Sequence, residues 1–168
     1  RFADVLEGGG GGDTLIGGSG DDSLFGGAGG DVMQGGAGND VFFDIAAGDQ
    51  VYGGRDADAI ALSGAAQVLD LTTMGLGTTT RIVGVERIDI TGSGDNELRL
   101  SVASVTAISG AVPLRIDGDA GDRVSSEDTW IEGATSDGYV TFTSGGATVQ
   151  VQEGVSAFVT FVVSEASG

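Results

Sequence analysis

An aspartate recurs at every ninth residue over the first third of the chain. The seven positions are Asp4, Asp13, Asp22, Asp31, Asp40, Asp49 and Asp58. Two residues after each aspartate stands an apolar side chain: Leu6, Leu15, Leu24, Met33, Phe42, Val51 and Ile60. A fixed period of this kind indicates stacked structural repeats, because a short unit can bury its apolar residue only against a neighbouring unit. No other feature of the chain constrains the fold as strongly.

A single unit, such as "GGAGNDVFF" at residues 35–43, suits a tight turn followed by a short strand. Glycines at its first, second and fourth places permit backbone conformations that other residues avoid, and they let neighbouring coils approach closely. The apolar residue at the eighth place points inward, because side chains alternate along a strand. Two nine-residue units then complete one coil, and we expect an all-β stack of parallel coils.

Stacking the coils about 4.8 Å apart aligns the aspartates in two ladders. One ladder holds Asp4, Asp22, Asp40 and Asp58, and the other holds Asp13, Asp31 and Asp49. Neighbouring carboxylates about 5 Å apart repel by about 3 kcal/mol at an effective dielectric constant near 20. No lysine or arginine lies between residues 8 and 43 to relieve this repulsion. Carboxylates and turn carbonyls form an all-oxygen cage, which predicts a hard divalent cation, calcium rather than magnesium.

The units resemble the "GGxGxDxUx" motif of the RTX, or hemolysin-type, calcium-binding repeat family, closely over residues 8–43 and more loosely on either side. The resemblance implies a parallel β-roll, a right-handed solenoid of 18-residue coils, with each Ca²⁺ held between stacked turns. It implies about five ions, between Asp4 and Asp22, Asp22 and Asp40, Asp40 and Asp58, Asp13 and Asp31, and Asp31 and Asp49. Further ligands implied are the backbone carbonyls of Gly9, Gly11, Gly18, Gly20, Gly26, Ala28, Gly35, Ala37, Gly53 and Arg55. The family also implies a bacterial protein exported by type I secretion, which folds outside the cell or at its surface.

Two units depart from the motif. Asp44 and Ile45 stand where the unit ending at Asp49 should have its first two glycines, and Asp56 replaces the fourth-place glycine of the unit ending at Asp58. We expect these units to cap the roll while still holding ions.

The charge balance restricts the possible partners. The chain has 25 acidic and 7 basic residues and a net charge of −18, which argues against nucleic acid and anionic membranes and favours cations. It has no cysteine and no histidine, so disulfides, thiolate metal sites and histidine-based catalysis are excluded. No apolar run reaches the roughly 18 residues of a membrane helix. Because the chain begins within the repeat pattern at Arg1, we expect it to be part of a longer protein.

Composition changes after the repeats, and we predict two domains, a β-roll over residues 1–64 and a β-rich, partly antiparallel extension over residues 65–168. Strands are predicted at residues 78–90, 96–102, 113–117, 139–144, 147–152 and 156–163. The turn sequences "SDGY" and "SGGA" predict an antiparallel meander over residues 139–163. No helix is predicted, because the best candidate, "SVASVTAIS" at residues 101–109, is rich in valine and threonine.

Several motifs in the extension invite a functional reading. "TGSGDNEL" repeats the turn glycines with Asn96 in the aspartate column, and residues 84–152 resemble a segment of very large RTX-type adhesins and cell-surface proteins. Asp117, Asp119 and Asp122 form either a further calcium site or a polar turn with its own hydrogen bonds. Trp130 is interpreted as a core residue rather than a sugar-binding platform.

The sequence favours a binding module over an enzyme. No nucleophile elbow or phosphate-binding loop is present, and nothing favours a glycosidase pair among Glu127, Asp128, Glu132 and Asp137. The leading hypothesis is a calcium-binding structural module of a secreted bacterial protein that folds on binding Ca²⁺. The alternatives are an adhesion or self-assembly module that uses residues 65–168, and an accessory domain of a secreted enzyme.

Overall fold

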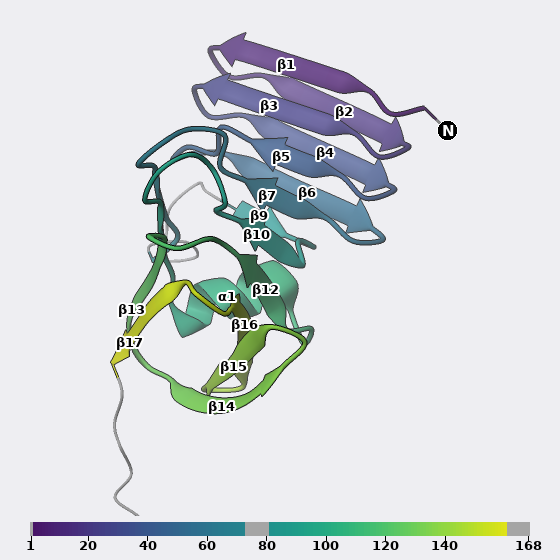
Figure 1. The fold of residues 1–168 in the computed structure, drawn as a ribbon. Helices are drawn as coiled ribbons and strands as arrows, with labels where there is room; N and C mark the ends of the chain where they lie inside the picture. Colours follow the sequence, from purple (N-terminus) through teal and green to yellow (C-terminus); the bar gives the residue numbers. More distant parts are fainter. Residues whose placement is uncertain (1, 73–80, 161–168) are drawn as a thin grey trace, which may run out of the picture.

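The computed structural model describes residues 2–72 and 81–160, which form a stack of short strands and one short helix (Figure 1). The prediction of a mainly β protein is confirmed for these residues. Within them, no helix is long and apolar enough to span a membrane.

The repeats form two parallel sheets from alternate strands. Sheet A begins with β1 (Val5–Gly10), β3 (Ser23–Ala28), β5 (Val41–Phe43) and β7 (Ala59–Ala61), and sheet B contains β2 (Thr14–Ser19), β4 (Val32–Ala37), β6 (Gln50–Arg55) and β9 (Arg81–Val83). Leu6 lies opposite Leu24 and Leu15 lies opposite Met33, an offset of 18 residues in each sheet. The strand register therefore follows the nine-residue period, two units to a coil.

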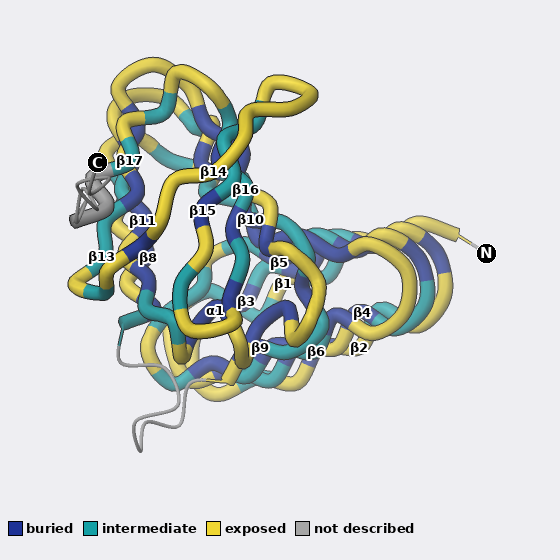
Figure 2. Tube along the Cα trace, turned by 90° about the horizontal axis from the view of Figure 1, so that it is seen from below, coloured by how far each residue is buried: buried dark blue, intermediate teal, exposed yellow. Residues whose placement is uncertain are grey.

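The apolar column of the repeats lines the interior between the two sheets. Leu24, Met33, Phe42, Val51 and Ile60 are all completely buried, and Figure 2 shows the buried segments on the inside of the coils. The neighbouring residues on each strand face outward, where Phe25 and Phe43 stack with ring centres 4.4 Å apart. Burial of one apolar side chain per unit is the main hydrophobic contribution to the stack.

The turns can stack only because of their glycines. Gly36 and Gly38 have φ angles of +117° and +129°, a region that side chains disfavour. A Cβ atom on either residue would also overlap a carbonyl oxygen of the preceding coil, that of Gly18 or Gly20. A larger residue at these two places would separate the coils.

Sheet A continues past the repeats, and a third sheet replaces sheet B. Sheet A gains the parallel strands β10 (Arg87–Asp89), β12 (Leu114–Asp117) and β16 (Ala147–Gln152), and then the antiparallel strands β15 (Tyr139–Ser144) and β14 (Ile131–Ser136). Sheet C consists of β8 (Val68–Asp70), β11 (Glu97–Arg99), β13 (Arg123–Thr129) and β17 (Ser156–Thr160), all parallel. The core is continuous through both parts of the chain.

The antiparallel meander is shorter than predicted. The turns at residues 136–139 and 144–147 join β14, β15 and β16 as expected. The prediction that the meander continues to residue 163 is wrong, because β17 pairs in parallel with β13 in sheet C, and residues 161–163 lie outside the described part of the chain. The turn at residues 153–155 takes the chain from one sheet to the other, so these strands also form a coil. The strand predicted at 78–90 is divided at Gly84 into β9 and β10, and its residues 78–80 are likewise outside the described part.

The prediction of no helix is wrong, because α1 (Val102–Ser109) forms in the segment judged the poor candidate. Ser101 and Ser104 make a capping box at its start, and the carboxylate of Asp128 accepts a hydrogen bond of 2.7 Å from the Val102 N–H. Val105 and Ile108 are buried in the core. Capping and packing together outweigh the low helix propensity of valine and threonine.

Helix α1 also ends sheet B. The carbonyl oxygen of Ile108 accepts a hydrogen bond of 2.9 Å from the N–H of Gly84, the residue after β9. The helix thus lies where a further strand would pair with β9. Trp130 is 1% exposed and donates from Nε1 to the Ser126 hydroxyl at 3.0 Å, so it is a core residue, as the sequence indicated.

We predict that Phe42→Ala lowers the free energy of unfolding of the calcium-loaded chain by about 3–5 kcal/mol, because the change leaves a cavity between the sheets. Phe25→Ala is the matched control, since Phe25 lies on the outer face, and its loss should cost about 1 kcal/mol. Urea denaturation followed by circular dichroism measures both changes. Equal losses for the two variants would contradict the placement of Phe42 in the core.

Candidate metal centre

A regular hydrogen bond links each repeat aspartate to the one in the next coil. The backbone N–H of Asp22 donates to Oδ1 of Asp40 at 2.9 Å. The same bond, at 2.8–2.9 Å, joins Asp4 to Asp22, Asp13 to Asp31, Asp31 to Asp49, and Asp40 to Asp58. The aspartates therefore stand in the two ladders that the period predicts, and in each ladder every Oδ1 after the first aspartate has a donor.

The second carboxylate oxygen of most repeat aspartates is buried without any partner. This holds for Oδ2 of Asp13, Asp22, Asp31, Asp40 and Asp58 among the described residues. Leaving a buried polar group unsatisfied costs about 1–3 kcal/mol, and more when the group is charged. Five such atoms in one block indicate that a group outside the chain completes the site.

Each unpartnered oxygen lies beside the first glycine of its unit, and at three of these five glycines, Gly8, Gly17 and Gly53, a carbonyl oxygen of the next coil lies there too. A Cβ atom on Gly8 would lie 2.6 Å from the carbonyl oxygen of Gly26 in the next coil and 3.1 Å from Oδ2 of Asp13. A Cβ on Gly17 would lie 2.9 Å from the carbonyl oxygen of Gly35 and closer still to Oδ2 of Asp22. The missing side chain of the first glycine thus leaves a cradle in which a carboxylate oxygen meets a carbonyl oxygen.

The electrostatics of the ladder disfavour charged carboxylates in the absence of a cation. Burial raises the pKa of Asp58 to about 7; the hydrogen bond with Asp40 opposes this shift, and the charges of Asp40, Glu86 and Asp56 reinforce it. Burial likewise raises the pKa of Asp40 and of Asp49, with the neighbouring aspartate of the ladder adding to each shift. The block holds negative charge that a bound cation would neutralise.

The unit at residues 44–52, which departs most from the motif, provides a donor for the second carboxylate oxygen of its aspartate. Oδ2 of Asp49 accepts a hydrogen bond of 2.7 Å from the N–H of Ala46, so this turn satisfies its carboxylate internally. Asp44 and Asp56, which replace turn glycines, take positive φ angles of 57° and 75°. Asp56 thus keeps the positive φ of the fourth-place glycines, whereas the first-place glycines that Asp44 replaces do not have a positive φ; both aspartates carry some conformational cost.

The carbonyls implied as ligands fall into different settings. Those of Gly26 and Gly35 face the cradles, while those of Gly9, Gly11, Gly18 and Gly20 face glycines of the next coil. The carbonyls of Ala28 and Ala37 accept hydrogen bonds from the N–H groups of Gly11 and Gly20. Gly53 lies beside Oδ2 of Asp58, and Arg55 is an exposed residue at the end of β6, opposite Ala37.

These donors fit a calcium ion. Among the described residues no three acidic side chains converge on one point, and the oxygens that lie beside the unpartnered carboxylates at Gly8, Gly17 and Gly53 are backbone carbonyls. An all-oxygen site with flexible glycine turns suits a hard cation that accepts irregular coordination, as calcium does.

In the β-rich part, a side-chain amide takes the place of the ladder carboxylate. Oδ1 of Asn96 accepts from the N–H of Gln67 at 2.9 Å, as the ladder aspartates do for the preceding coil. Its Nδ2 donates to the carbonyl oxygens of Ile90 and Gly94 at 3.0 and 3.3 Å. The side-chain amide therefore meets turn carbonyls without any cation.

The three aspartates at residues 117–122 do not share a site. Asp117 accepts hydrogen bonds from Arg87, Arg115 and the Tyr139 hydroxyl, at 3.1, 3.0 and 2.5 Å. Burial raises the pKa of Asp117, but these hydrogen bonds outweigh it and hold the pKa below its usual range.

The other two form a polar turn. Oδ2 of Asp122 accepts from the Asp119 N–H, and its Oδ1 accepts from the Asn96 N–H, each at 2.8 Å. Of the two readings of this segment, the geometry matches the turn with its own hydrogen bonds.

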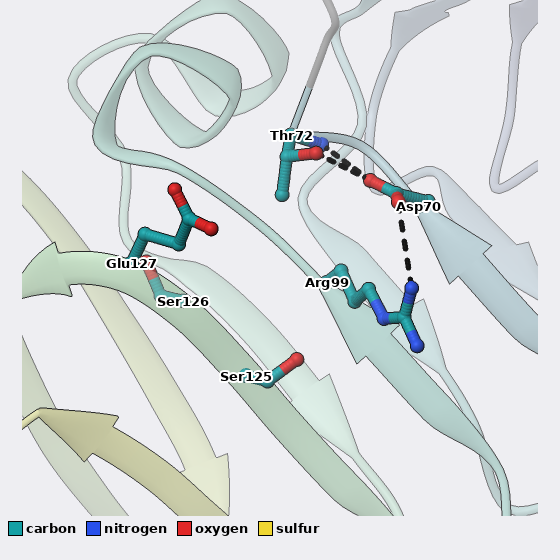
Figure 3. A pocket seen from close by; sticks show the side chains of 6 residues that line it. All are labelled: Asp70, Thr72, Arg99, Ser125, Ser126 and Glu127. Carbon is teal, nitrogen blue, oxygen red and sulfur yellow. Dashed lines mark hydrogen bonds and ion pairs between the residues drawn. The ribbon is translucent and has the colours of Figure 1, made fainter.

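A surface pocket of about 370 Å³ lies over sheet C, lined by Asp70, Thr72, Arg99, Ser125, Ser126 and Glu127 (Figure 3). Hydrogen bonds from Thr72 lower the pKa of Asp70, and its ion pair with Arg99, at 3.8 Å, acts in the same direction. Asp128 is engaged at the start of α1. The lowered pKa of Asp70 does not suit a general acid, which requires a raised pKa.

Sequence reasoning missed one carboxylate at the end of a ladder. The N–H of Asp58 donates to Oε2 of Glu86 at 3.0 Å, as the other ladder aspartates do to the next coil. Glu86 lies 28 residues away, so the nine-residue period could not reveal it. Its one sequence signal is the glycine two residues earlier, Gly84.

We predict that protons compete with calcium for the block. The raised pKa of Asp58 means that the metal-free folded chain binds a proton that the unfolded chain releases between about pH 4 and pH 7. The contribution of Asp58 to metal-free stability is therefore fully present below about pH 4 and is lost as the pH rises to about 7. Calcium affinity should rise over the same range, by at most tenfold per pH unit for each proton released. Calorimetric titrations at pH 5.5, 6.5 and 7.5 measure this, and a constant affinity would contradict it.

We also predict that Asn96→Asp makes the β-rich part sensitive to calcium. The change removes two amide hydrogen bonds and creates a buried carboxylate oxygen without a donor, which should lower metal-free stability by about 2–4 kcal/mol. Trp130 fluorescence during thermal unfolding reports the loss, and added calcium should restore part of it. Asn96→Ala is the control, because it loses the same bonds but offers no ligand; equal recovery of both variants in calcium would contradict the prediction.

Comparison with known families agrees with this geometry. Residues 7–42 and 26–60 match the model of the RTX calcium-binding nonapeptide repeat, which spans four copies of the repeat. No curated protein matches the chain. The matched segment covers the aspartate ladders from Asp13 to Asp58, with their glycine cradles. The chain therefore contains, from residue 7 to residue 60, a block of RTX calcium-binding nonapeptide repeats.

Proposed function

We propose that the chain is a calcium-dependent structural module of a secreted bacterial RTX protein. Residues 1–64 form a right-handed β-roll that closes on about five Ca²⁺ ions outside the cell, and residues 65–168 form a β-rich domain that caps it. The observation that carries the proposal is the set of buried, unpartnered Oδ2 atoms above glycine cradles.

Four of the five cradles match the aspartate pairs proposed as calcium sites. They pair Asp13 with Asp31, Asp22 with Asp40, Asp31 with Asp49, and Asp40 with Asp58, and each first partner supplies the unpartnered Oδ2. Asp4, at the exposed end of its ladder, pairs with Asp22. Bound Ca²⁺ would supply positive charge between oxygens that otherwise repel each other.

The mechanism is linkage between binding and folding. A cation that binds only the closed turns stabilises the folded state by its whole binding free energy, because the unfolded chain does not bring the ligands together. Without cations, the glycine-rich turns carry a high conformational entropy cost and the ladders repel. At calcium concentrations on the order of millimolar, typical of extracellular sites, the block should fold.

We predict that the chain stripped with EDTA gains β structure cooperatively when calcium is added, and that magnesium does not replace calcium. Circular dichroism through the two titrations is the measurement. The gain in β structure should come from the repeats, because in the β-rich part the Asn96 amide already makes hydrogen bonds to its turn carbonyls without calcium. Full strand content in EDTA would overturn the folding mechanism.

Asp40→Ala sharpens this test. The change removes a central ladder carboxylate and leaves the Asp22 N–H without its acceptor, so the calcium midpoint of folding should rise several-fold. Glu153→Gln, an exposed change outside the ladders, removes the same charge and should leave the midpoint unchanged. Equal midpoints for the two variants would contradict the role of the ladder.

A further inference from the structure

We infer that Asp58 and Glu86 form a further calcium site, which joins the repeat block to the β-rich part of the chain. The inference rests on the proposed calcium-dependent function and adds a site that the nine-residue motif does not contain.

The first observation is the unfinished coordination of Asp58. Its Oδ1 accepts from the N–H of Asp40 at 2.9 Å, which completes the link to the preceding coil. Its Oδ2 is buried without a partner, and the residue is 1% exposed. The pair of Asp40 and Asp58 uses the Oδ2 of Asp40, so the Oδ2 of Asp58 requires a partner of its own.

The second observation is a cradle of the repeat type in front of this oxygen. A Cβ on Gly53 would lie 2.5 Å from Oδ2 of Asp58 and would overlap the carbonyl oxygen of Gly84. In the regular turns the second oxygen comes from the first glycine of the next coil, as Gly35 does for Gly17. Gly84 takes that place here with a φ angle of +67°, although it stands outside the repeats.

The third observation is the position of Glu86. Its Oε2 accepts the Asp58 N–H at 3.0 Å, the bond that an aspartate of the next coil makes elsewhere in the ladder. Within the described part of the chain, no arginine forms an ion pair with Glu86, and the adjacent Arg87 pairs with Asp89 and Asp117 instead. Glu86 thus brings an uncompensated carboxylate to the cradle.

These groups suit calcium for the same reason as the regular sites do. Two carboxylates and a backbone carbonyl form an all-oxygen donor set, and one carboxylate oxygen is buried without a protein partner. The coil that carries Glu86 is irregular, because β9 pairs with β6 at an offset of 31 residues, from Gln50 to Arg81, and not at the 18 residues of the repeats. A glutamate, which is one methylene longer than an aspartate, stands at the ladder position of this coil. An ion at this place would bind the last repeat turn to the turn between β9 and β10.

The test counts bound calcium in the full chain. Equilibrium dialysis at saturating calcium should give one ion fewer for Glu86→Gln than for the unmodified chain. The glutamine keeps an oxygen for the Asp58 N–H, so the fold should persist, which circular dichroism checks. Glu132→Gln, on the exposed strand β14, is the matched control and should keep the full number of ions.

A second variant separates loss of the site from loss of the fold. Asp58→Asn places an amide where its Nδ2 meets a turn carbonyl, as Asn96 does in the β-rich part, so the turn should form without this ion. Asp58→Asn also changes the pair of Asp40 and Asp58, but Glu86 belongs only to the site that it shares with Asp58, so adding Glu86→Gln to Asp58→Asn should remove no further ion. The calcium-induced rise in the Trp130 unfolding midpoint should be smaller in each of these variants.

The outcomes distinguish this inference from the proposed function. If the unmodified chain binds no calcium, the proposed function itself fails. If the chain binds calcium and Glu86→Gln keeps every ion, the repeat sites stand and the site at Asp58 and Glu86 is wrong. Additive losses in the double variant would also overturn it, since they would place the two residues in separate sites.

Discussion

A buried carboxylate oxygen without a hydrogen-bond donor is the interaction on which the repeat block depends. For Asp22, Asp31, Asp40 and Asp58, the backbone of the preceding coil gives one donor, to Oδ1, and Oδ2 is left beside a glycine that has no side chain. Glycine is needed at that place because a Cβ atom there would overlap the carboxylate oxygen, while the second and fourth glycines of the unit, such as Gly36 and Gly38, are needed for their positive φ angles. Turn shape, coil spacing and charge therefore converge on one requirement, a cation between coils.

In the β-rich part, protein groups and not a cation satisfy the buried polar side chains at the corresponding places. Asn96 turns an amide toward the carbonyls of its turn, and Asp117 is held by Arg87, Arg115 and Tyr139. All five arginines between residues 65 and 168 lie at or after Arg81, whereas residues 8–43 contain none. Within residues 2–72 and 81–160, one continuous core thus joins a β-rich part with no unpartnered buried side-chain oxygen to a repeat block that has five.

The sequence predicted the features that are repeated and missed those that occur once. The spacing of Asp22, Asp40 and their apolar partners was sufficient for register, ladders and core, because the same contact recurs in each coil. Helix α1 depends on a capping box and on burial of Ile108 against β9, which are tertiary effects that propensity does not contain. The pairing of β17 with β13 and the position of Glu86 both follow insertions that break the period, so spacing alone could not locate them.

The side-chain ladder has a direction. Every link runs from a backbone N–H to a carboxylate of the coil that follows, from Asp4 to Asp22 and onward to Glu86. A coil removed from the start of the stack leaves a carboxylate acceptor without its donor, whereas a coil removed from the other end leaves a backbone N–H donor without its acceptor. The two ends of the stack therefore differ in the kind of group, acceptor or donor, that a missing neighbour would leave without a partner. Glu86 supplies the last acceptor of one ladder, so that ladder is terminated by a residue outside the repeats.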